Sequence, residues 1–134
     1  MREPKLYFLD TGLLCYLLNI RTADDLRIHN MRGPVFETYV ISEIHKQIQN
    51  RGMDGSMYYW RDSNDREIDL LVEWGATSTP VEIKSARTIN SRFFDIFGYW
   101  RNVTDNPDAG GVLVYGGQEE YMQKGVHVLP ATGL

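Results

Sequence analysis

Two charged residues interrupt an otherwise apolar segment in the second half of the chain. Glu82 and Lys84 lie two residues apart in the stretch TPVEIKSA, beside Val81 and Ile83. Because side chains alternate along a β-strand, Glu82 and Lys84 would share one face and the two β-branched residues the other. A buried carboxylate and a buried ammonium are costly unless water, mutual pairing, or a metal ion with a phosphate compensates them.

Two further carboxylates stand where the surrounding sequence is apolar. Asp69 interrupts the run of residues 68–72, which is typical of a strand buried on both faces. Glu37 lies one helical turn before Ile41, so it extends the apolar stripe of a predicted helix. Since neighbouring strands lie about 4.8 Å apart, Asp69 and Glu82 can converge if their strands pair.

This set of side chains has a coherent chemical interpretation. Hard divalent cations such as Mg²⁺ or Mn²⁺ prefer oxygen ligands and retain several waters, so Asp69 and Glu82 with Glu37 nearby would suffice. Such an ion neutralises a phosphodiester and activates water, and Lys84 could orient that water or stabilise the developing charge. The alternatives are an ordinary strand with a solvated charged face and a structural ion pair between Glu37 and Lys84.

The elements that position these residues follow from hydrophobic periodicity and turn residues. Asp10 or Thr11 would cap a first helix and Thr22 a second, and Pro34 suits the first turn of a third. The predicted elements are, in chain order, an extended segment at 5–10, helices at 11–20, 22–29 and 34–50, strands at 58–62, 67–74 and 79–85, a helix at 90–103, and strands at 110–116 and 125–131.

The order after residue 33 is helix, three strands, helix, then one or two strands. This order predicts an α/β fold, a mixed sheet flanked by helices. We expect a single domain over 1–134, with a helical N-terminal part at 1–32 and the core at 33–134. The aromatic residues of the helix at 90–103 have helical spacing and are predicted to cover the sheet; they are Phe93, Phe94, Phe97 and Trp100.

Composition limits the classes of function. The net charge of -4 argues against coating nucleic acid by charge alone, although carboxylates grouped at a metal site also make the total more acidic. The single cysteine, Cys15, excludes an intramolecular disulfide and favours a reducing, cytoplasmic compartment. No apolar run approaches the roughly 18 residues of a membrane span, so no membrane partner is expected.

The four charged residues and their elements resemble the PD-(D/E)XK nuclease-like superfamily, whose fold is restriction-endonuclease-like. Glu37 on the first core helix, Asp69 on the second strand and Glu82-x-Lys84 on the third correspond to its motif. The proline that often precedes the motif aspartate is Ile68 here. The resemblance implies a catalytic site of Glu37, Asp69, Glu82 and Lys84 that hydrolyses DNA with Mg²⁺ or Mn²⁺, with RNA as a possible substrate.

Longer blocks resemble a domain of unknown function found C-terminal to an AAA+-type ATPase module in many prokaryotic proteins. These blocks are KLYFLDTGLL, GPVFETYVISEI, YYWRDSNDREIDLLVE and PVEIKSA. The resemblance implies a C-terminal fragment of a larger ATPase, whose N-terminal module would be its partner. The chain has no GxxxxGK[ST] loop, so we expect no ATPase activity from it alone.

Two questions stay open from the sequence. Arg87 and Arg92 follow the motif strand and could contact phosphates, although arginines at a helix entry are equally consistent with simple solvation. The other question is the class of function. A non-catalytic interaction or regulatory domain of the ATPase that keeps the nuclease fold is the alternative to an enzyme.

Overall fold

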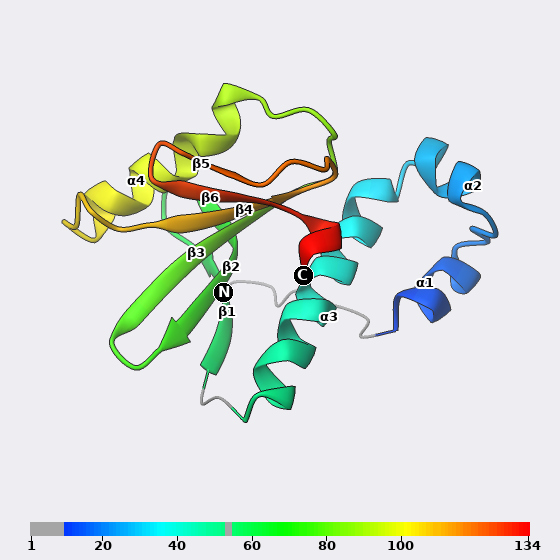
Figure 1. Ribbon diagram of the computed structural model, residues 1–134, viewed down its shortest axis with the longest axis horizontal. Coiled ribbons are helices and arrows are strands. Elements are labelled where there is room, and N and C mark those ends of the chain that lie inside the picture. Colours follow the sequence, from blue (N-terminus) through cyan, green and yellow to red (C-terminus); the bar gives the residue numbers. More distant parts are fainter. Residues whose placement is uncertain (1–9, 53–54) are drawn as a thin grey trace.

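The computed structural model describes residues 10–52 and 55–134, which form a six-stranded sheet with helices on both sides (Figure 1). The helices are α1 (Thr11–Leu17), α2 (Ala23–Ile28), α3 (Arg32–Asn50) and α4 (Asp95–Val103), with 3₁₀ turns at Ser91–Phe94 and Ala131–Gly133. The strands are β1 (Gly55–Arg61), β2 (Glu67–Trp74), β3 (Thr77–Lys84), β4 (Gly111–Tyr115), β5 (Tyr121–Gln123) and β6 (Val126–Pro130). Apart from Asp10, the predicted extended segment at 5–10 lies outside the described residues.

The sheet is mixed, which confirms the predicted α/β class. Its strand order is β1-β2-β3-β4-β6-β5. The pairs β1/β2 and β2/β3 are antiparallel, β3/β4 and β4/β6 are parallel, and β5 pairs antiparallel with β6. The short edge strand β5 was not predicted, because three residues give too little alternation to recognise.

Local capping explains where the helices begin. Asp10 caps α1, and Thr22 caps α2 through a capping box with Asp25, as the sequence predicts. Helix α3 begins two residues earlier than predicted, and Pro34 lies in its first turn, where a missing N–H costs nothing. The predicted helix at 90–103 instead begins with a 3₁₀ turn capped by Asn90, a common start for an α-helix.

The two faces of the sheet bury different hydrophobic clusters. On one face α3 packs through Val40, Ile41 and Ile48 onto Leu70, Val72, Val81, Ile83 and Val114. On the other face Phe94 and Phe97 pack with Leu113, Tyr115, Val126 and Val128, and Trp100 packs with Ile68 and Leu71. The prediction that this helix covers the sheet with aromatic residues is therefore confirmed, with Phe93 partly buried at the margin.

Strand β2 is irregular at Asp69. Tyr58 of β1 pairs with Leu71 and Trp60 pairs with Ile68, so β2 holds one more residue than β1 across this interval. This extra residue is a β-bulge, and it allows Ile68 and Leu71 to join the same cluster on the α4 side. A bulge commonly re-aims a side chain, and here it does so next to Asp69.

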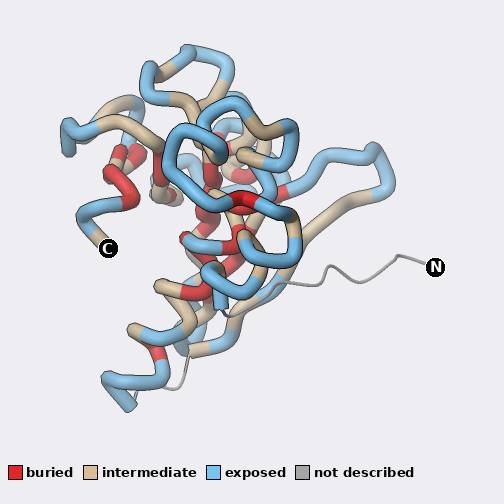
Figure 2. The backbone as a smooth tube through the Cα atoms, turned by 90° about the vertical axis from the view of Figure 1, so that its right-hand side faces the viewer, coloured by how far each residue is buried: buried red, intermediate tan, exposed pale blue. Residues whose placement is uncertain are grey.

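Helices α1 and α2 contain no buried residues and are mostly pale in Figure 2. They extend to one side of the sheet, where they contact α3 (Figure 1). Among the described residues, no helix has the length and apolar character needed to cross a membrane.

Replacing Phe97 with Ala should lower the free energy of unfolding by about 3–5 kcal/mol, because a cavity replaces the large buried ring. Urea unfolding followed by circular dichroism measures this change. The control Val103→Ala shortens an exposed side chain of the same helix and should change the free energy by less than about 0.5 kcal/mol. Equal effects of the two substitutions would contradict the packing of α4 on the sheet.

Candidate active site

Two hydrogen bonds to carboxyl oxygens cross between β2 and β3 beside Asp69 and Glu82. The Asp69 N–H donates to Glu82 Oε1 at 3.1 Å, and the Ile83 N–H donates to Asp69 Oδ2 at 2.8 Å. Both bonds lie directly beyond Leu70 and Val81, the last paired residues of the β2–β3 ladder. Two carboxylates thus take the place that backbone carbonyl oxygens hold elsewhere in the ladder, and this exchange fixes them beside each other.

Glu82 lies in an environment that disfavours its charged form. Its exposed fraction is 6%. Burial, followed by the nearby Asp69 charge, raises the pKa of Glu82 from 4.5 to about 8, and Glu37 adds to the rise. The hydrogen bond from the Asp69 N–H and the charge of Lys84 act in the opposite direction but are outweighed. An ordinary solvated strand face therefore does not describe Glu82.

Lys84 lies at the open side of this pair. Its Nζ is 3.7 Å from Glu82 Oε2 and 5.5 Å from the centroid of the Phe93 ring. Its side chain is about one-third exposed, in contrast to Glu82. The two residues share the face of β3 turned toward α4, as the alternation predicts, and Lys84 links the buried carboxylate to solvent.

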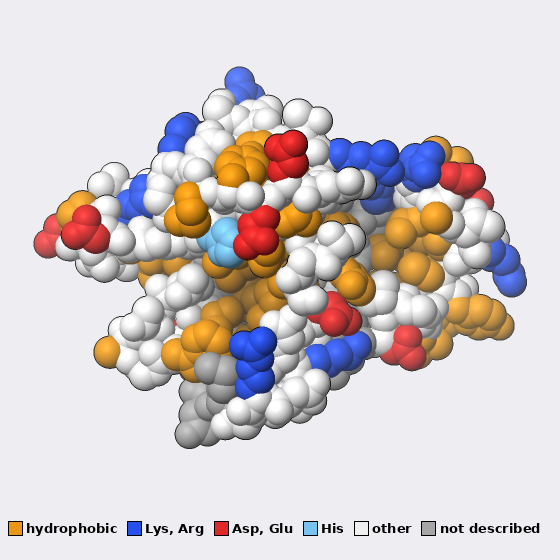
Figure 3. All heavy atoms as spheres, in the orientation of Figure 1, with side chains coloured by type: hydrophobic (Ala, Val, Ile, Leu, Met, Phe, Trp, Pro, Cys, Tyr) orange, Lys and Arg blue, Asp and Glu red, His pale blue; other side chains and the backbone are white. Residues whose placement is uncertain are grey.

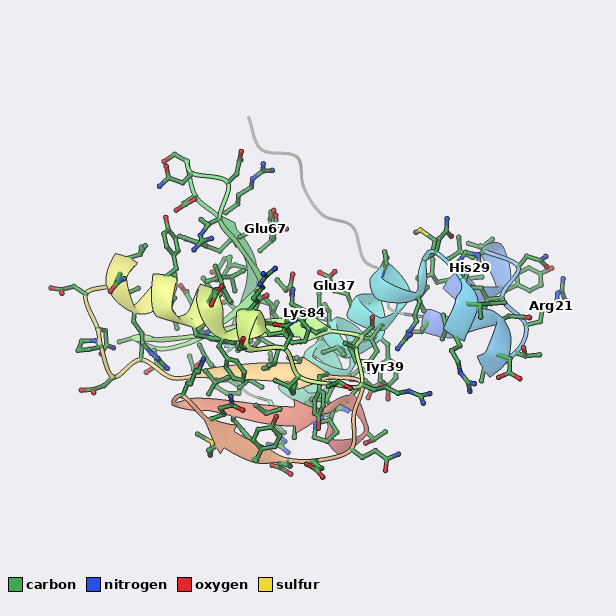
Figure 4. The ribbon with its side chains drawn as sticks, turned by 90° about the horizontal axis from the view of Figure 1, so that it is seen from above. Arg21, His29, Glu37, Tyr39, Glu67 and Lys84 are labelled. Carbon is green, nitrogen blue, oxygen red and sulfur yellow. The ribbon has the colours of Figure 1, made fainter. Side chains whose placement is uncertain are left out.

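Glu37 approaches the site from α3. The side chain is half-buried, and its charge is close enough to raise the pKa of Glu82. Arg32 in the first turn of α3 donates from Nη2 to the Ser85 carbonyl oxygen at 2.8 Å, which ties this end of the helix to the end of β3. In Figure 4, Glu37 and Lys84 both lie in the region between α3 and α4.

Glu82 and Lys84 line a cleft of about 270 Å³ on the α4 side of the sheet, whereas Asp69 and Glu37 are not among its lining residues. Its lining residues are Asp65, Arg66, Glu67, Glu82, Lys84, Arg92, Phe93, Asp95 and Ile96. Of the two arginines predicted to contact phosphate, the structure brings Arg92 to this cleft. Arg87 lines a different cleft, together with Tyr115 and Gly116.

Several cleft residues were not predicted from the sequence. Asp65, Arg66 and Glu67 come from the turn and the first residue of β2, just ahead of Asp69. The Tyr59 hydroxyl of β1 donates a hydrogen bond to Glu67. The sequence does contain one signal for Glu67. It stands two residues before Asp69 on the same predicted strand, and side chains two residues apart on a strand point to the same face.

The donor set is suited to a hard cation but is not a preformed cage. Among the described residues, no three histidine, cysteine or acidic side chains are grouped closely enough to hold a metal ion. Mg²⁺ typically binds proteins through one or two carboxylates and keeps waters, so Asp69 and Glu82 are enough. A cation there would also favour the charged form of Glu82, which the protein itself disfavours.

The stability of the domain should fall as the pH rises from about 5 to about 8, because the Glu82 carboxyl keeps its proton in the folded state. In the unfolded chain this group loses the proton near pH 4.5, so the folded state binds more protons within this window. Urea unfolding across the window measures the effect, and Glu82→Gln should flatten the pH dependence. The control Glu73→Gln, on the same strand as Asp69, should keep the wild-type slope; a Glu82→Gln variant that also keeps it would contradict the assigned pKa.

Comparison with known proteins shows the family of the chain. Residues 32–134 match the family described as Domain of unknown function (DUF4143). Two curated relatives, Uncharacterized protein Mb2031c of Mycobacterium bovis and Uncharacterized protein Rv2008c of Mycobacterium tuberculosis, are each 34% identical over 87 residues, which is 65% of this chain. The chain spans 19% of the length of these relatives, and no solved structure matches it. The matched segment contains all four predicted catalytic residues, and the chain belongs to the DUF4143 family.

Proposed function

We propose that this domain hydrolyses phosphodiester bonds of DNA with Mg²⁺ or Mn²⁺ bound by Asp69 and Glu82, with Glu37 nearby. The observation that supports the proposal is the buried Glu82 carboxyl, hydrogen-bonded across two strands with Asp69 and facing Lys84 in an open cleft. Perturbed carboxyl groups grouped at a cleft are typical of functional sites. RNA has the same phosphodiester chemistry and is a second possible substrate.

Burial of Glu82 beside two other acidic residues costs free energy, which favours a functional role for this group over a structural one. A structural ion pair in the interior is retained without penalty only where the attraction between its partners offsets their lost hydration. Here the charges of Asp69 and Glu37 both oppose ionisation of Glu82, and the Lys84 ammonium does not compensate them. A bound divalent cation would supply the missing positive charge and would give these acidic residues a role at their positions.

The chain's own residues have distinct roles in this proposal. Asp69 and Glu82 would hold the cation, and the reciprocal backbone hydrogen bonds keep both carboxylates oriented. When bound, the metal would neutralise the phosphate and lower the pKa of a water molecule. Lys84, with its ammonium at the open side, would hold that water or stabilise negative charge developing on the phosphate.

The wider assignment is also part of the proposal. The helix, three strands, helix and strands of the domain agree with a restriction-endonuclease-like fold of the PD-(D/E)XK superfamily. The relatives are much longer than the matched segment, which leaves room for an AAA+-type ATPase module ahead of this domain. Such a protein would work on nucleic acid in the cytoplasm, and the ATPase module would regulate or load this site.

Cleavage of single-stranded, duplex and branched DNA and of RNA, with Mg²⁺ or Mn²⁺, tests the proposed reaction. Wild-type protein should cleave at least one of these substrates, EDTA and Asp69→Asn should abolish cleavage, and Lys84→Ala should slow it by about a hundredfold. Glu73→Gln lies on the same strand outside the cleft and should be as active as the wild type. Cleavage that survives Asp69→Asn would assign the activity to another site or a contaminant.

Metal binding can be tested separately from cleavage. Millimolar Mg²⁺ should raise the free energy of unfolding by about 1.4 kcal/mol once the free ion reaches about ten times its dissociation constant. Asp69→Asn should remove this gain, and Glu73→Gln should keep it. Identical wild-type melting curves with Mg²⁺, with Mn²⁺ and with EDTA would count against the metal site.

One observation favours the second candidate, a non-catalytic interaction or regulatory domain. The described residues contain no group of three side chains that could hold a metal, so the acidic site is less complete than a dedicated cage. Under this alternative Glu82 and Lys84 stabilise the fold, and Glu82→Ala would lower stability by about 3–5 kcal/mol, as expected on breaking a buried pair. A metal site predicts that the stability lost in Glu82→Ala is larger with Mg²⁺ than in EDTA, because only the wild type gains stability from the bound ion.

A further inference from the structure

A second cleft with a volume of about 370 Å³ lies between α4 and the turn that joins β5 to β6, next to the cleft of Glu82. Its lining residues are Arg66, Phe94, Asp95, Phe97, Gly98, Tyr99, Arg101, Lys124 and Val126. Three of these residues are cationic and one is acidic, although the chain as a whole has a net charge of -4. We call this second cleft the α4 cleft.

The cations of the α4 cleft are held by neutral partners. Arg101 donates from Nε to the Ala109 carbonyl oxygen at 2.7 Å and from Nη2 to the Lys124 carbonyl oxygen at 2.8 Å. The Arg66 guanidinium lies 4.8 Å from the centroid of the Tyr99 ring. Carbonyl dipoles and aromatic faces orient a cation without cancelling its charge. The cleft therefore keeps its positive charge available to an anion.

Lys124 completes the cleft from the turn between β5 and β6. Its Nζ lies 5.4 Å from the centroid of the Phe94 ring. The hydrogen bond from Arg101 to the Lys124 carbonyl oxygen joins this turn to the end of α4, and Figure 1 shows both at the same end of the sheet. The charges thus come from three separate elements that are fixed to one another.

The α4 cleft adjoins the candidate active site. Arg66 and Asp95 line both clefts, so the two clefts meet beside the start of α4. Gly98 lies on the wall of the α4 cleft, and a Cβ atom added there would meet nothing within 4 Å. A chain-like ligand can therefore approach the helix closely along this wall.

We propose that the α4 cleft binds a backbone phosphate of the nucleic-acid strand whose cleavable bond lies at Glu82 and Lys84. This inference rests on the proposed function. Arg66, Lys124 and Arg101 are the phosphate-binding cations, and Arg101 also holds the cleft together. On the face drawn in Figure 3, basic side chains form separate groups among acidic ones, without a continuous stripe. Binding at a few defined phosphates suits such a surface better than charge spread over the whole domain.

Binding of fluorescein-labelled DNA and RNA oligonucleotides in EDTA tests the α4 cleft without any cleavage. The double variant Arg66→Gln/Lys124→Gln should bind about tenfold more weakly than the wild type. The slope of log affinity against log salt should fall by about 1 for each lost phosphate contact. Lys124→Gln alone should show part of both effects, and this residue lines only the α4 cleft of the two. Comparing the two oligonucleotides shows which nucleic acid is bound more tightly.

The control is Lys46→Gln, which removes a lysine on α3 that pairs with Glu43 away from both clefts. It should leave the affinity and the salt slope unchanged. Unchanged binding by the double variant, or no binding of either oligonucleotide by the wild type at low salt, would overturn the α4 cleft as a phosphate site. Absence of cleavage together with Lys124-dependent binding would overturn the proposed catalysis alone, and cleavage with Lys124-independent binding would overturn the α4 cleft alone.

Discussion

The rest of the site depends on two hydrogen bonds: the Asp69 N–H donates to the Glu82 carboxyl group, and the Ile83 N–H donates to the Asp69 carboxyl group. The β2–β3 ladder ends at Leu70 and Val81, and beyond that point the N–H groups of Asp69 and Ile83 donate to carboxyl groups in place of carbonyl oxygens. Buried backbone N–H groups must be paired, so the carboxylates cannot leave without a cost to the sheet. The fold and the site therefore share the same two side chains.

The bulge in β2 makes these two hydrogen bonds compatible with a buried core. Without the extra residue, strict alternation would put Ile68 and Leu71 on opposite faces. With it, both pack in the cluster of Trp100, and Asp69 keeps its hydrogen bond to the Ile83 N–H. Helix α4 can thus cover the first half of β2 while the Asp69 carboxyl group accepts a hydrogen bond from β3. One irregular pairing between β1 and β2 thus lets β2 contribute both to the core and to the candidate site.

Much of the fold could be predicted because its helices and strands follow from patterns among residues that are close in the sequence. The capping box of Thr22, the first-turn Pro34 and the apolar alternation of β2 and β3 each report on their immediate neighbours. The alternation of side chains along β3 also predicts that Glu82 and Lys84 lie on one face. The bulge and the strand β5 were not predictable in this way, because the first depends on pairing with β1 and the second is only three residues long.

The cations around the site show the limit of sequence reasoning more sharply. Arg87 and Arg92 were candidates because they follow the motif strand, yet only Arg92 reaches the cleft of Glu82. Arg66 and Lys124 are almost sixty positions apart in the sequence. They line the same cleft because the turn before β2 and the β5–β6 turn both lie beside α4. Under the proposed function, this acidic domain would have to concentrate its positive charge locally to bind a polyanion, since its overall field is repulsive. Tertiary packing, not composition, is what provides that concentration here.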